Sequence, residues 1–431
     1  MKNKEIKNST ELVQHIINVE KEIGLLDQKS ENYSWEWAAH RMEFYYLIAK
    51  EAGILDQAHD DSNTVSNFGG FLRTLKYTIR SPFVSFQRGT TVVIPHKRKV
   101  LYKGKMQDLN SLFVQNEIQQ NEEVEVWDLP YNNEHKIKGR DIYYLDLISI
   151  AGRIGSIFGN LYVNKRVTSL ANIIEEKLQI KVDLIKHISR ASAQFRVKKF
   201  LFKLLLKIKA IKEIYVVIAY GHTALIEAAK ELSIPVIELQ HGVINKFHFG
   251  YHYPHVSKSD YFPDQLWVWH EMWKNSAYFP VSDPKIKVNK NNHLERFKQK
   301  CSSVNEENSV LIISQGTIGK ELSDYILKNC NNLNSFKIYY KLHPGEFKSS
   351  ENYKSLIELS KQSNVEIIKD EMSIYDLFAR VKVVIGVYST ALYEAHYFEK
   401  NIYIAPITGS EYMREFLKEE KVEMYNSQIE I

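Results

Sequence analysis

The carboxyl-terminal part of the chain alternates short apolar runs with helical segments, and this alternation constrains the fold more than any other feature. Strand-like runs occupy 309–314, 336–342, 364–368, 382–387 and 401–404, and helical patterns occupy 319–329, 351–362, 373–380 and 390–398. Strands that are joined by crossover helices form parallel sheets covered by helices on both faces. The series therefore predicts a doubly wound α/β domain.

A further βαβ unit is expected in the first part of the chain. The β-rich run 214–219 predicts one strand, and the run 234–239 predicts the next. Between them, Gly221-His222-Thr223 forms a turn in which Thr223 caps a helix over 224–232. The predicted fold class is therefore α/β, with two doubly wound Rossmann-type domains that face each other across a cleft.

The first 200 residues carry weaker signals. Helical spacing covers 10–27 and 35–52, Asn67-Phe68-Gly69-Gly70 indicates a turn, and Thr91-Val92-Val93-Ile94-Pro95 is a candidate strand. These elements do not define a topology. The region 264–300 passes from tryptophans to a polar stretch rich in lysine and asparagine, which indicates a connector between the domains.

Composition and cysteine content limit the class of protein. The 431 residues are 44% hydrophobic and 25% charged, as in globular proteins, and the length suits two domains. Cys301 and Cys330 belong to no Cys-x-x-Cys pair and cannot build a disulfide framework, which favours a reducing compartment. The amino terminus has no signal-type apolar core, and no run of about 18 apolar residues occurs. We expect a cytoplasmic protein that does not span a membrane.

One segment concentrates positive charge in a chain whose net charge is only +5. Residues 196–212 hold one arginine and six lysines without an acid, interleaved with leucine, isoleucine and phenylalanine. The segment fits peripheral contact with the anionic inner face of the plasma membrane. It also fits an ordinary helix that packs its apolar side on the sheet and solvates its lysines. No nucleic-acid recognition motif accompanies the charge, so no nucleic-acid partner is expected.

Three short motifs place ligand-binding groups at the ends of predicted strands. Lys341-Leu342-His343-Pro344-Gly345 closes one apolar run, and Ser389-Thr390 follows another and opens a helix. Gln315-Gly316-Thr317 is a third strand-to-helix turn. Parallel sheets bind ligands at the carboxyl ends of their strands, and the start of a helix offers unpaired N–H groups to an anion. Together the motifs predict a phosphate site.

These motifs, with Glu394 behind Ser389-Thr390 and Glu238-Leu239-Gln240-His241-Gly242 upstream, resemble GT-B glycosyltransferases of bacterial surface polysaccharide synthesis. They are similar to capsule and lipopolysaccharide enzymes that use CMP-linked sialic acid or Kdo donors, and to CDP-glycerol glycerophosphotransferases. The resemblance extends over roughly 210–405. Gln240-His241-Gly242 stands where such sialyltransferases usually carry an acidic motif, so the identity of the sugar stays open.

The resemblance implies a division of labour between the two domains. An acceptor-side domain is expected over 1–290, with its Rossmann-like part best defined at 210–260. A domain that binds the nucleotide-sugar donor is expected over 291–410. The remaining residues, 411–431, are expected to form a tail or a helix.

Glycosyl transfer requires a base for the acceptor hydroxyl. His241 directly follows a predicted strand and precedes Gly242, so its ring is expected to emerge at the carboxyl end of the sheet, and it is the candidate base. Glu238, within the strand, is the alternative base or orients His241 through a hydrogen bond. A purely structural histidine in the turn is also compatible with the sequence. Other histidines are close in sequence but lack metal-ligand spacing, so no metal site is predicted; they are His222, His248, His252, His255 and His270.

Transfer also requires a cradle for the departing phosphate. Ser389 and Thr390 would bind phosphate oxygens, unless they serve only as a helix cap, and His343 would donate to the phosphate or nucleotide. Lys341 either contributes charge or is solvated, and Glu394 either accepts from ribose hydroxyls or caps the helix. The predicted donor site comprises Lys341, His343, Pro344, Gly345, Ser389, Thr390, Glu394, Gln315, Gly316 and Thr317.

The predicted function is that of an inverting, metal-independent glycosyltransferase without a cofactor. It would move a sugar from a nucleotide donor, with CMP favoured, to a glycan or lipid-linked glycan in capsule, O-antigen or lipopolysaccharide synthesis. Two alternatives use the same scaffold, namely a CDP-polyol phosphotransferase and a UDP-sugar epimerase. A third is a non-catalytic partner in glycan assembly.

Overall fold

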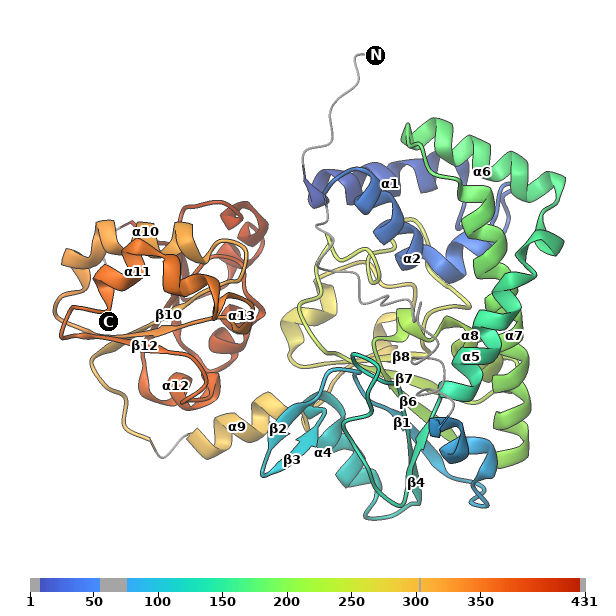
Figure 1. Ribbon diagram of the computed structural model, residues 1–431, viewed down its shortest axis with the longest axis horizontal. Coiled ribbons are helices and arrows are strands. Elements are labelled where there is room, and N and C mark those ends of the chain that lie inside the picture. The colour runs from blue at the N-terminus through green and yellow to red at the C-terminus, as the bar shows by residue number, and fades with distance from the viewer. Residues whose placement is uncertain (1–7, 55–75, 302–303, 427–431) are drawn as a thin grey trace. The chain divides into compact units, whose positions relative to one another are not determined.

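The computed structural model describes residues 8–54, 76–301 and 304–426, and the chain divides into two compact units, Met1–Asn292 and His293–Ile431 (Figure 1). The turn expected at 67–70 lies outside the described residues. Within the described ranges, the helices are all too short or too polar to cross a membrane.

Unit 1 is built on a parallel sheet of seven strands in the order β5-β4-β1-β6-β7-β8-β9. The strands of this sheet are β1 Thr91–Ile94, β4 Val124–Asp128, β5 Ile142–Tyr144, β6 Glu213–Val217, β7 Val236–Leu239, β8 Gln265–Val268 and β9 Ile286–Val288. The central strands β1 and β7 are buried at every position, as expected for a sheet covered on both faces. A small antiparallel hairpin joins β2 Val100–Tyr102 to β3 Lys105–Gln107.

The order of the strands reverses direction between β1 and β6. From β1 the chain moves outward to β4 and β5, then returns to β6 and moves the other way to β9. Such a switch point leaves a crevice beyond the carboxyl ends of the two central strands, because the crossovers on either side lead away from it.

Seven described α-helices belong wholly to unit 1. They are α1 Ser9–Ile23, α2 Trp35–Glu51, α4 Leu109–Ile118, α5 Asp146–Ile157, α6 Lys165–Leu178, α7 Leu184–Lys209 and α8 Thr223–Lys230. Helices α1, α2 and α6 and the first half of α7 share an apolar cluster with Leu12, Ile16, Ile48, Ile174 and Ile188, whereas the second half of α7 packs on the sheet.

Helix α5 packs closely on α7 because glycines face the contact. A Cβ added at Gly155 would lie 2.6 Å from Val197 Cγ2, and one added at Gly152 would lie 2.7 Å from Lys198 Cε. At the other end of α7, the buried ammonium of Lys209 pairs with Glu125 of β4 at 2.7 Å. The ion pair fixes α7 against the sheet, and the glycine contacts hold α5 against α7.

Unit 2 repeats the same design with six parallel strands in the order β12-β11-β10-β13-β14-β15. The strands are β10 Ser309–Ile313, β11 Lys337–Lys341, β12 Val365–Ile368, β13 Val383–Gly386, β14 Asn401–Ile404 and β15 Val422–Met424; the helices are α9 His293–Cys301, α10 Gly319–Asn329, α11 Lys354–Leu359, α12 Ile374–Arg380 and α13 Thr390–Tyr397. Its strand order reverses between β10 and β13. The prediction of two doubly wound parallel sheets is confirmed.

Three local expectations are wrong. The supposed connector 264–300 contributes strands β8 and β9, which escaped notice because each is short and only partly apolar. The supposed tail 411–431 contains β15, which pairs with β14 and buries only Val422 among its three residues. Thr223 does not cap α8; it is the first helical residue, and no side chain caps this helix.

Candidate functional site

The site in unit 1 lies at the switch point of its sheet. His96 follows β1, Tyr220 follows β6 and His241 follows β7, so three neighbouring strands deliver one ring each. The rings of His96 and His241 stack with centroids 5.9 Å apart and planes at 13°, and Tyr220 meets His241 edge-on at 6.3 Å. The structure therefore places His241 where α/β sheets bind their ligands.

Glu238 and His241 are linked through a tyrosine that the sequence does not reveal. The fully buried Glu238 accepts at Oε1 from the Ala219 amide at 2.9 Å and from the Tyr251 hydroxyl, and the same hydroxyl lies 3.3 Å from His241 Nδ1. Since the Tyr251 proton is donated to Glu238, its oxygen accepts from Nδ1–H, which leaves Nε2 of a neutral His241 as an acceptor. Glu238 thus orients His241 through Tyr251 rather than directly.

Burial sets the charge of these groups. It raises the pKa of Glu238 to about 7, and burial together with His248 and His96 lowers the pKa of His241 to about 3. His241 is therefore neutral near pH 7, and the same lowered pKa makes its ring a weak base while the site is empty of substrate. The imidazolium formed when His241 accepts a proton would be stabilised by Glu238, at the other end of the hydrogen-bond chain, once that carboxyl is ionised above about pH 7.

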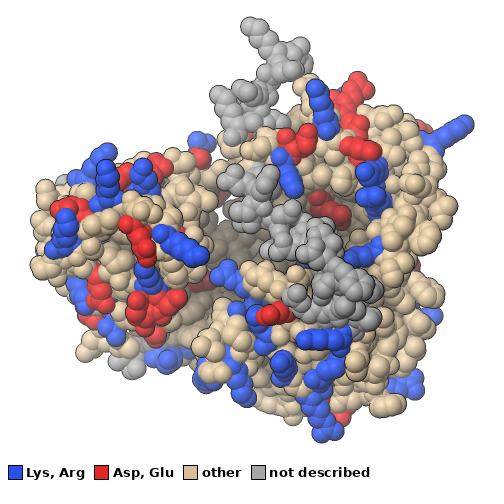
Figure 2. Space-filling view, viewed as in Figure 1, with Lys and Arg blue, Asp and Glu red and all other residues tan. Residues whose placement is uncertain are grey.

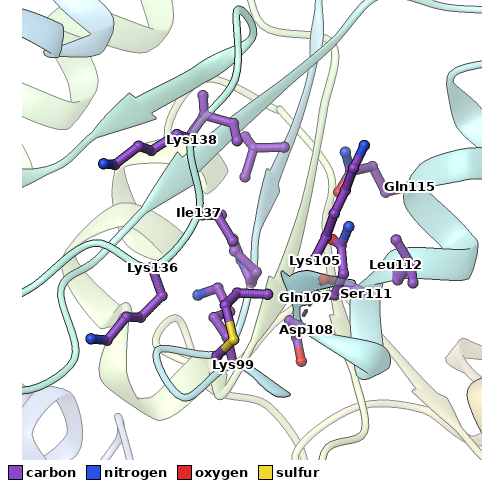
Figure 3. Close-up of a pocket in the computed structure, with 14 residues that line it drawn as sticks. Lys99, Lys105, Gln107, Asp108, Ser111, Leu112, Gln115, Lys136, Ile137 and Lys138 are labelled. Atoms are coloured by element: carbon purple, nitrogen blue, oxygen red, sulfur yellow. Dashed lines mark hydrogen bonds between the residues drawn. The ribbon is translucent and has the colours of Figure 1, made fainter. Parts of the chain in front are cut away.

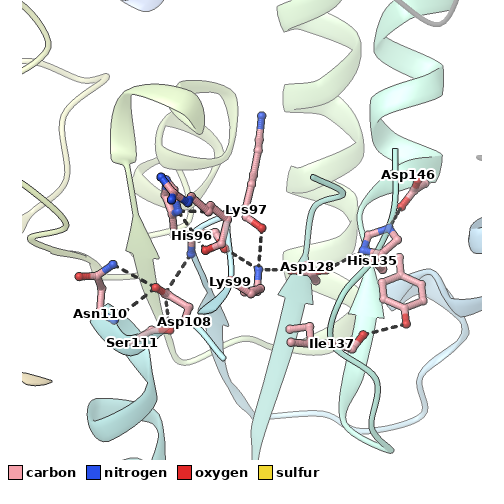
Figure 4. A network of polar contacts seen from close by, with 12 residues as sticks. His96, Lys97, Lys99, Asp108, Asn110, Ser111, Asp128, His135, Ile137 and Asp146 are labelled. Carbon is pink, nitrogen blue, oxygen red and sulfur yellow. Dashed lines mark hydrogen bonds and ion pairs between the residues drawn. The ribbon is translucent and has the colours of Figure 1, made fainter. Parts of the chain in front are cut away.

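A buried polar network holds the segment that carries His96 (Figure 4). Lys99 Nζ pairs with Asp128 at 2.7 Å and donates to the His96 carbonyl, while Asp108 accepts from the His96 amide at 3.0 Å. Asp128 also contacts His135 at 2.6 Å. His135 bridges to Asp146 at 2.7 Å, and the two carboxylates raise its pKa despite its burial. The network fixes the loop after β1 from two sides.

Two of the cavities in unit 1 lie near the loops described above. The larger one, of about 510 Å³, borders the switch point through Tyr220 and His222. Three cations also line it, Lys97 from the loop after β1, Arg153 from α5 and Lys198 from α7. Burial lowers the pKa of Lys198 to about 8, which leaves it mostly protonated at neutral pH. Two carboxyl groups, those of Glu43 and Asp146, also line it, so the larger cavity suits a strongly polar ligand.

The smaller cavity, of about 360 Å³, lies beside the β2–β3 hairpin and is lined by Lys99, Lys105, Lys136 and Lys138, which come from three segments of the chain (Figure 3). Figure 2 shows lysine and arginine side chains gathered over this part of unit 1. None of the catalytic or donor-binding residues that the sequence predicted lines this cavity.

In unit 2, three predicted loops meet at the switch point. Gln315 Nε2 donates to the Tyr388 carbonyl at 3.0 Å, and the hydroxyls of Thr317 and Tyr388 are 2.8 Å apart. A Cβ added at Gly316 would lie 3.2 Å from His343 Nδ1, so this glycine permits close approach of the two loops. The loops after β10, β11 and β13 are thereby brought together.

His343 is held in one orientation by its own loop. Its Nδ1 accepts from the Gly345 amide at 3.0 Å, and the buried Glu346 accepts from the His343 amide at 2.8 Å, in a capping box that starts a short 3₁₀ turn at Pro344. A neutral ring that accepts at Nδ1 carries its proton on Nε2, where it can donate to an anion. Glu346 lies three residues after His343, which is the spacing of a capping box, and this spacing is the sequence signal that would have identified Glu346 as the residue that holds the turn.

The remaining donor-site residues take different roles. Ser389 is the N-cap of α13 and accepts from the Ala391 amide at 3.2 Å, while Thr390 is exposed on the first turn. Lys341 is not simply solvated, because its ammonium donates to the carbonyls of Lys369 and Met372 in the loop after β12. The expectation that Glu394 caps the helix is wrong.

Glu394 lies in the second turn of α13, away from the cap. There it hydrogen-bonds Tyr375 of α12, and burial raises its pKa to about 7. This contact directs the carboxylate toward α12, so the expected ribose contact has no support in the geometry.

A family model described as alpha-2,8-polysialyltransferase (POLYST) matches residues 276–405. The match runs from the end of unit 1 through β14 and includes the three loops that meet in unit 2. It bears out the prediction that the chain is an enzyme of the glycosyltransferase class. A search of curated proteins gives no match.

Several solved structures are similar over most of the chain. UDP-GlcNAc 2-epimerase from Neisseria meningitidis, bound to UDP-GlcNAc, is 13% identical and covers 78% of this chain and 87% of its own, with a TM-score of 0.46. MurG from Acinetobacter baumannii is 12% identical and covers 78% and 86%, also with a TM-score of 0.46. UDP-GlcNAc 2-epimerase from Methanocaldococcus jannaschii is 10% identical and covers 78% and 89%, with a TM-score of 0.45. These likenesses are weak, and the fold described above depends on the strand orders alone.

The raised pKa of Glu238 predicts a pH-dependent effect of Glu238→Gln on stability. The folded wild type keeps this carboxyl protonated up to about pH 7, whereas the unfolded chain ionises near 4.5, so this contribution to folding is lost as pH rises through 7. Glutamine cannot ionise. The free energy of unfolding of the variant, relative to wild type, should therefore rise by on the order of 2 kcal/mol between pH 5 and pH 8.

The measurement is urea unfolding followed by tryptophan fluorescence, because all six tryptophans of the chain belong to unit 1. The exposed Glu176→Gln in unit 1 is the control and should show no such trend. A constant difference between Glu238→Gln and wild type across this pH range would contradict the assignment.

Proposed function

We propose that this chain transfers a sugar from a nucleotide donor, with CMP-linked sugars favoured, to a bacterial surface glycan. The observation that carries the proposal is the chemistry gathered at the two switch points. Unit 2 joins a histidine donor, a helix start and a glycine turn, and unit 1 joins a neutral histidine to a buried carboxylate through a tyrosine. Such a division matches the two tasks of glycosyl transfer, which are leaving-group stabilisation and proton removal.

The donor nucleotide would bind at the unit 2 loops. His343 Nε2–H would donate to a phosphate oxygen, and Ser389, Thr390 and the start of α13 would supply hydroxyls and N–H groups to the same charge. Because Gly316 has no side chain, its loop can lie close to the His343 ring and to a phosphate bound there. The matched family model includes these loops, which supports the assignment of the donor site to unit 2.

The acceptor would bind at the unit 1 switch point. Its hydroxyl proton would pass to His241 Nε2 as the oxygen attacks the anomeric carbon, and the bond from that carbon to the phosphate oxygen would break. A single displacement of this kind inverts the anomeric configuration. We infer that no divalent metal is required, because hydrogen bonds and a helix dipole would stabilise the leaving phosphate and the sequence offers no Asp-x-Asp in a plausible loop.

The larger cavity would hold the acceptor sugar. The three cations in its lining, Lys97, Arg153 and Lys198, outnumber the two lining carboxyl groups, so a sugar that carries a carboxylate fits its charge. The name of the matched family refers to polysialic acid, whose units are acidic. The surface glycan to which such a sugar would be added is a capsule, O-antigen or lipopolysaccharide chain.

Nucleotide binding tests the donor site. Replacing Ser389 and Thr390 together by alanine should weaken CMP binding by roughly 1–3 kcal/mol, because hydrogen bonds to a charged phosphate are lost. Isothermal titration with CMP, CDP and UDP would measure this and would also separate the alternatives. Stronger binding of UDP than of CMP would favour an epimerase or a UDP-sugar donor.

The matched control for the donor site is Ser360→Ala, which removes an exposed hydroxyl elsewhere in unit 2. Its affinity for CMP should equal that of wild type. Unchanged CMP affinity in the Ser389→Ala, Thr390→Ala double variant would show that the phosphate lies elsewhere.

Turnover tests the base. His241→Ala should lower kcat by about 10²- to 10⁴-fold and leave CMP affinity unchanged, because proton removal affects the transition state and not donor binding. His255→Ala, an exposed histidine away from the switch point, is the control. Near-normal turnover of His241→Ala would remove this residue from the mechanism, and transfer-inactive wild type with intact CMP binding would point to a non-catalytic partner.

A further inference from the structure

Helices α5 and α7 present large apolar side chains to solvent on their outer side. Phe200, Leu204 and Ile208 of α7 recur every four residues and form one exposed stripe, with Phe200 68% exposed. In α5 and the following 3₁₀ turn Gly159–Tyr162, four more side chains are at least half exposed: Ile154, Ile157, Phe158 and Leu161. We call these seven residues the outer face. Buried apolar residues of α7, such as Phe202 and Leu205, instead pack in the core.

The outer face is formed by two helices that pack directly on each other. The close contact at Gly152 and Gly155 holds α5 against α7, and Figure 1 shows the two running side by side along the same flank of unit 1. In Figure 2 this flank shows a broad area without acidic side chains. Exposed apolar groups on adjoining elements mark an interaction surface more strongly than scattered ones do.

Charge identifies the partner that this surface fits. No aspartate or glutamate occurs from Leu147 to Asn172 or from Leu184 to Lys212, the two segments that build the outer face. Exposed cations accompany the apolar residues, among them Arg190 and Lys207. Apolar side chains with interspersed cations and no acids are typical of surfaces that lie on anionic lipid.

A second copy of the chain fits the outer face poorly. A symmetric dimer through this surface would place each copy's cations against the same patch of the other copy, and the two segments offer no acid to compensate them. Like charges brought together at an interface oppose association. An anionic bilayer satisfies both the cations and the apolar groups.

We propose that the outer face docks unit 1 on an anionic phospholipid surface. Under one of the two interpretations of the sequence, the whole segment 196–212 contacts the membrane. In the structure only one stripe of apolar side chains in that segment is exposed, and α5 and the residues after it supply the other apolar side chains of the contact. Lys199 and Lys203 pair with Glu227 of α8 and with Glu231, which follows this helix, so they contribute little net charge to the contact.

Docking has a geometric consequence for the larger cavity. The inward sides of the same two helices line it, through Ile148 and Ser149 of α5 and Gln194 and Phe202 of α7. One helix diameter, about 10 Å, therefore separates the cavity from the docked surface. A substrate anchored in the bilayer would find the cavity close to the lipid headgroups.

Vesicle co-sedimentation of the full chain tests the proposal. The wild type should sediment with phosphatidylcholine vesicles that contain phosphatidylglycerol, bind at least about 10-fold more weakly to phosphatidylcholine alone, and be partly released as salt rises. Replacing Phe200, Leu204 and Ile208 together by glutamine should lower binding to the anionic vesicles by about 10-fold or more. The control variant carries Leu101→Gln and Ile357→Gln, which change exposed apolar residues on other elements. It should bind the anionic vesicles as strongly as wild type does.

Vesicle binding requires no sugar transfer, so it stands or fails separately from the proposed function. The replaced side chains are exposed, and unchanged thermal unfolding would confirm that the triple variant folds. Wild type that does not sediment with the anionic vesicles, or a triple variant that binds them as wild type does, would overturn the proposal. A concentration-dependent dimer that is lost in the triple variant, without vesicle binding, would show instead that the outer face joins two copies.

Discussion

The reversal of strand order in each parallel sheet determines where this protein can carry out chemistry. Loops after adjacent strands β1, β6 and β7 meet in unit 1, and loops after β11, β10 and β13 meet in unit 2. Crossover helices lead away on both sides, so the ends of the central strands stay accessible. The candidate base and the candidate phosphate cradle are both consequences of this arrangement, although His241 precedes the three cradle motifs by about 75 to 150 residues.

Buried carboxylates hold these loops in place. Asp128 fixes the loop that carries His96, Glu238 orients His241 through Tyr251, and Glu346 fixes the His343 turn. Burying such groups is costly unless each is hydrogen-bonded or protonated, and the raised pKa of Glu238 and of Glu346 reflects that cost. Loops held in this way keep their polar groups oriented before any ligand arrives, which reduces the entropy lost on binding.

Local patterns predicted most of the second unit well, because strands β10 to β13 are short apolar runs that are each followed by a helix. They failed where elements are short or the signal is not local. Strands β8, β9 and β15 have too few buried residues to stand out, and Tyr251 follows His241 by ten residues in an irregular loop, so only the fold brings their side chains together. The roles of Lys341 and Glu394 likewise depended on partners 28 residues later and 19 residues earlier, which no spacing rule identifies.

In the mechanism that we propose, a phosphate cradle and a separate histidine base carry out one displacement without a metal. The most direct measurement is nuclear magnetic resonance of the product formed from a CMP-linked sugar and an acidic glycan acceptor, with and without EDTA. We expect an inverted anomeric configuration and an unchanged rate in EDTA. A product of retained configuration, or transfer that stops when EDTA is added, would contradict it.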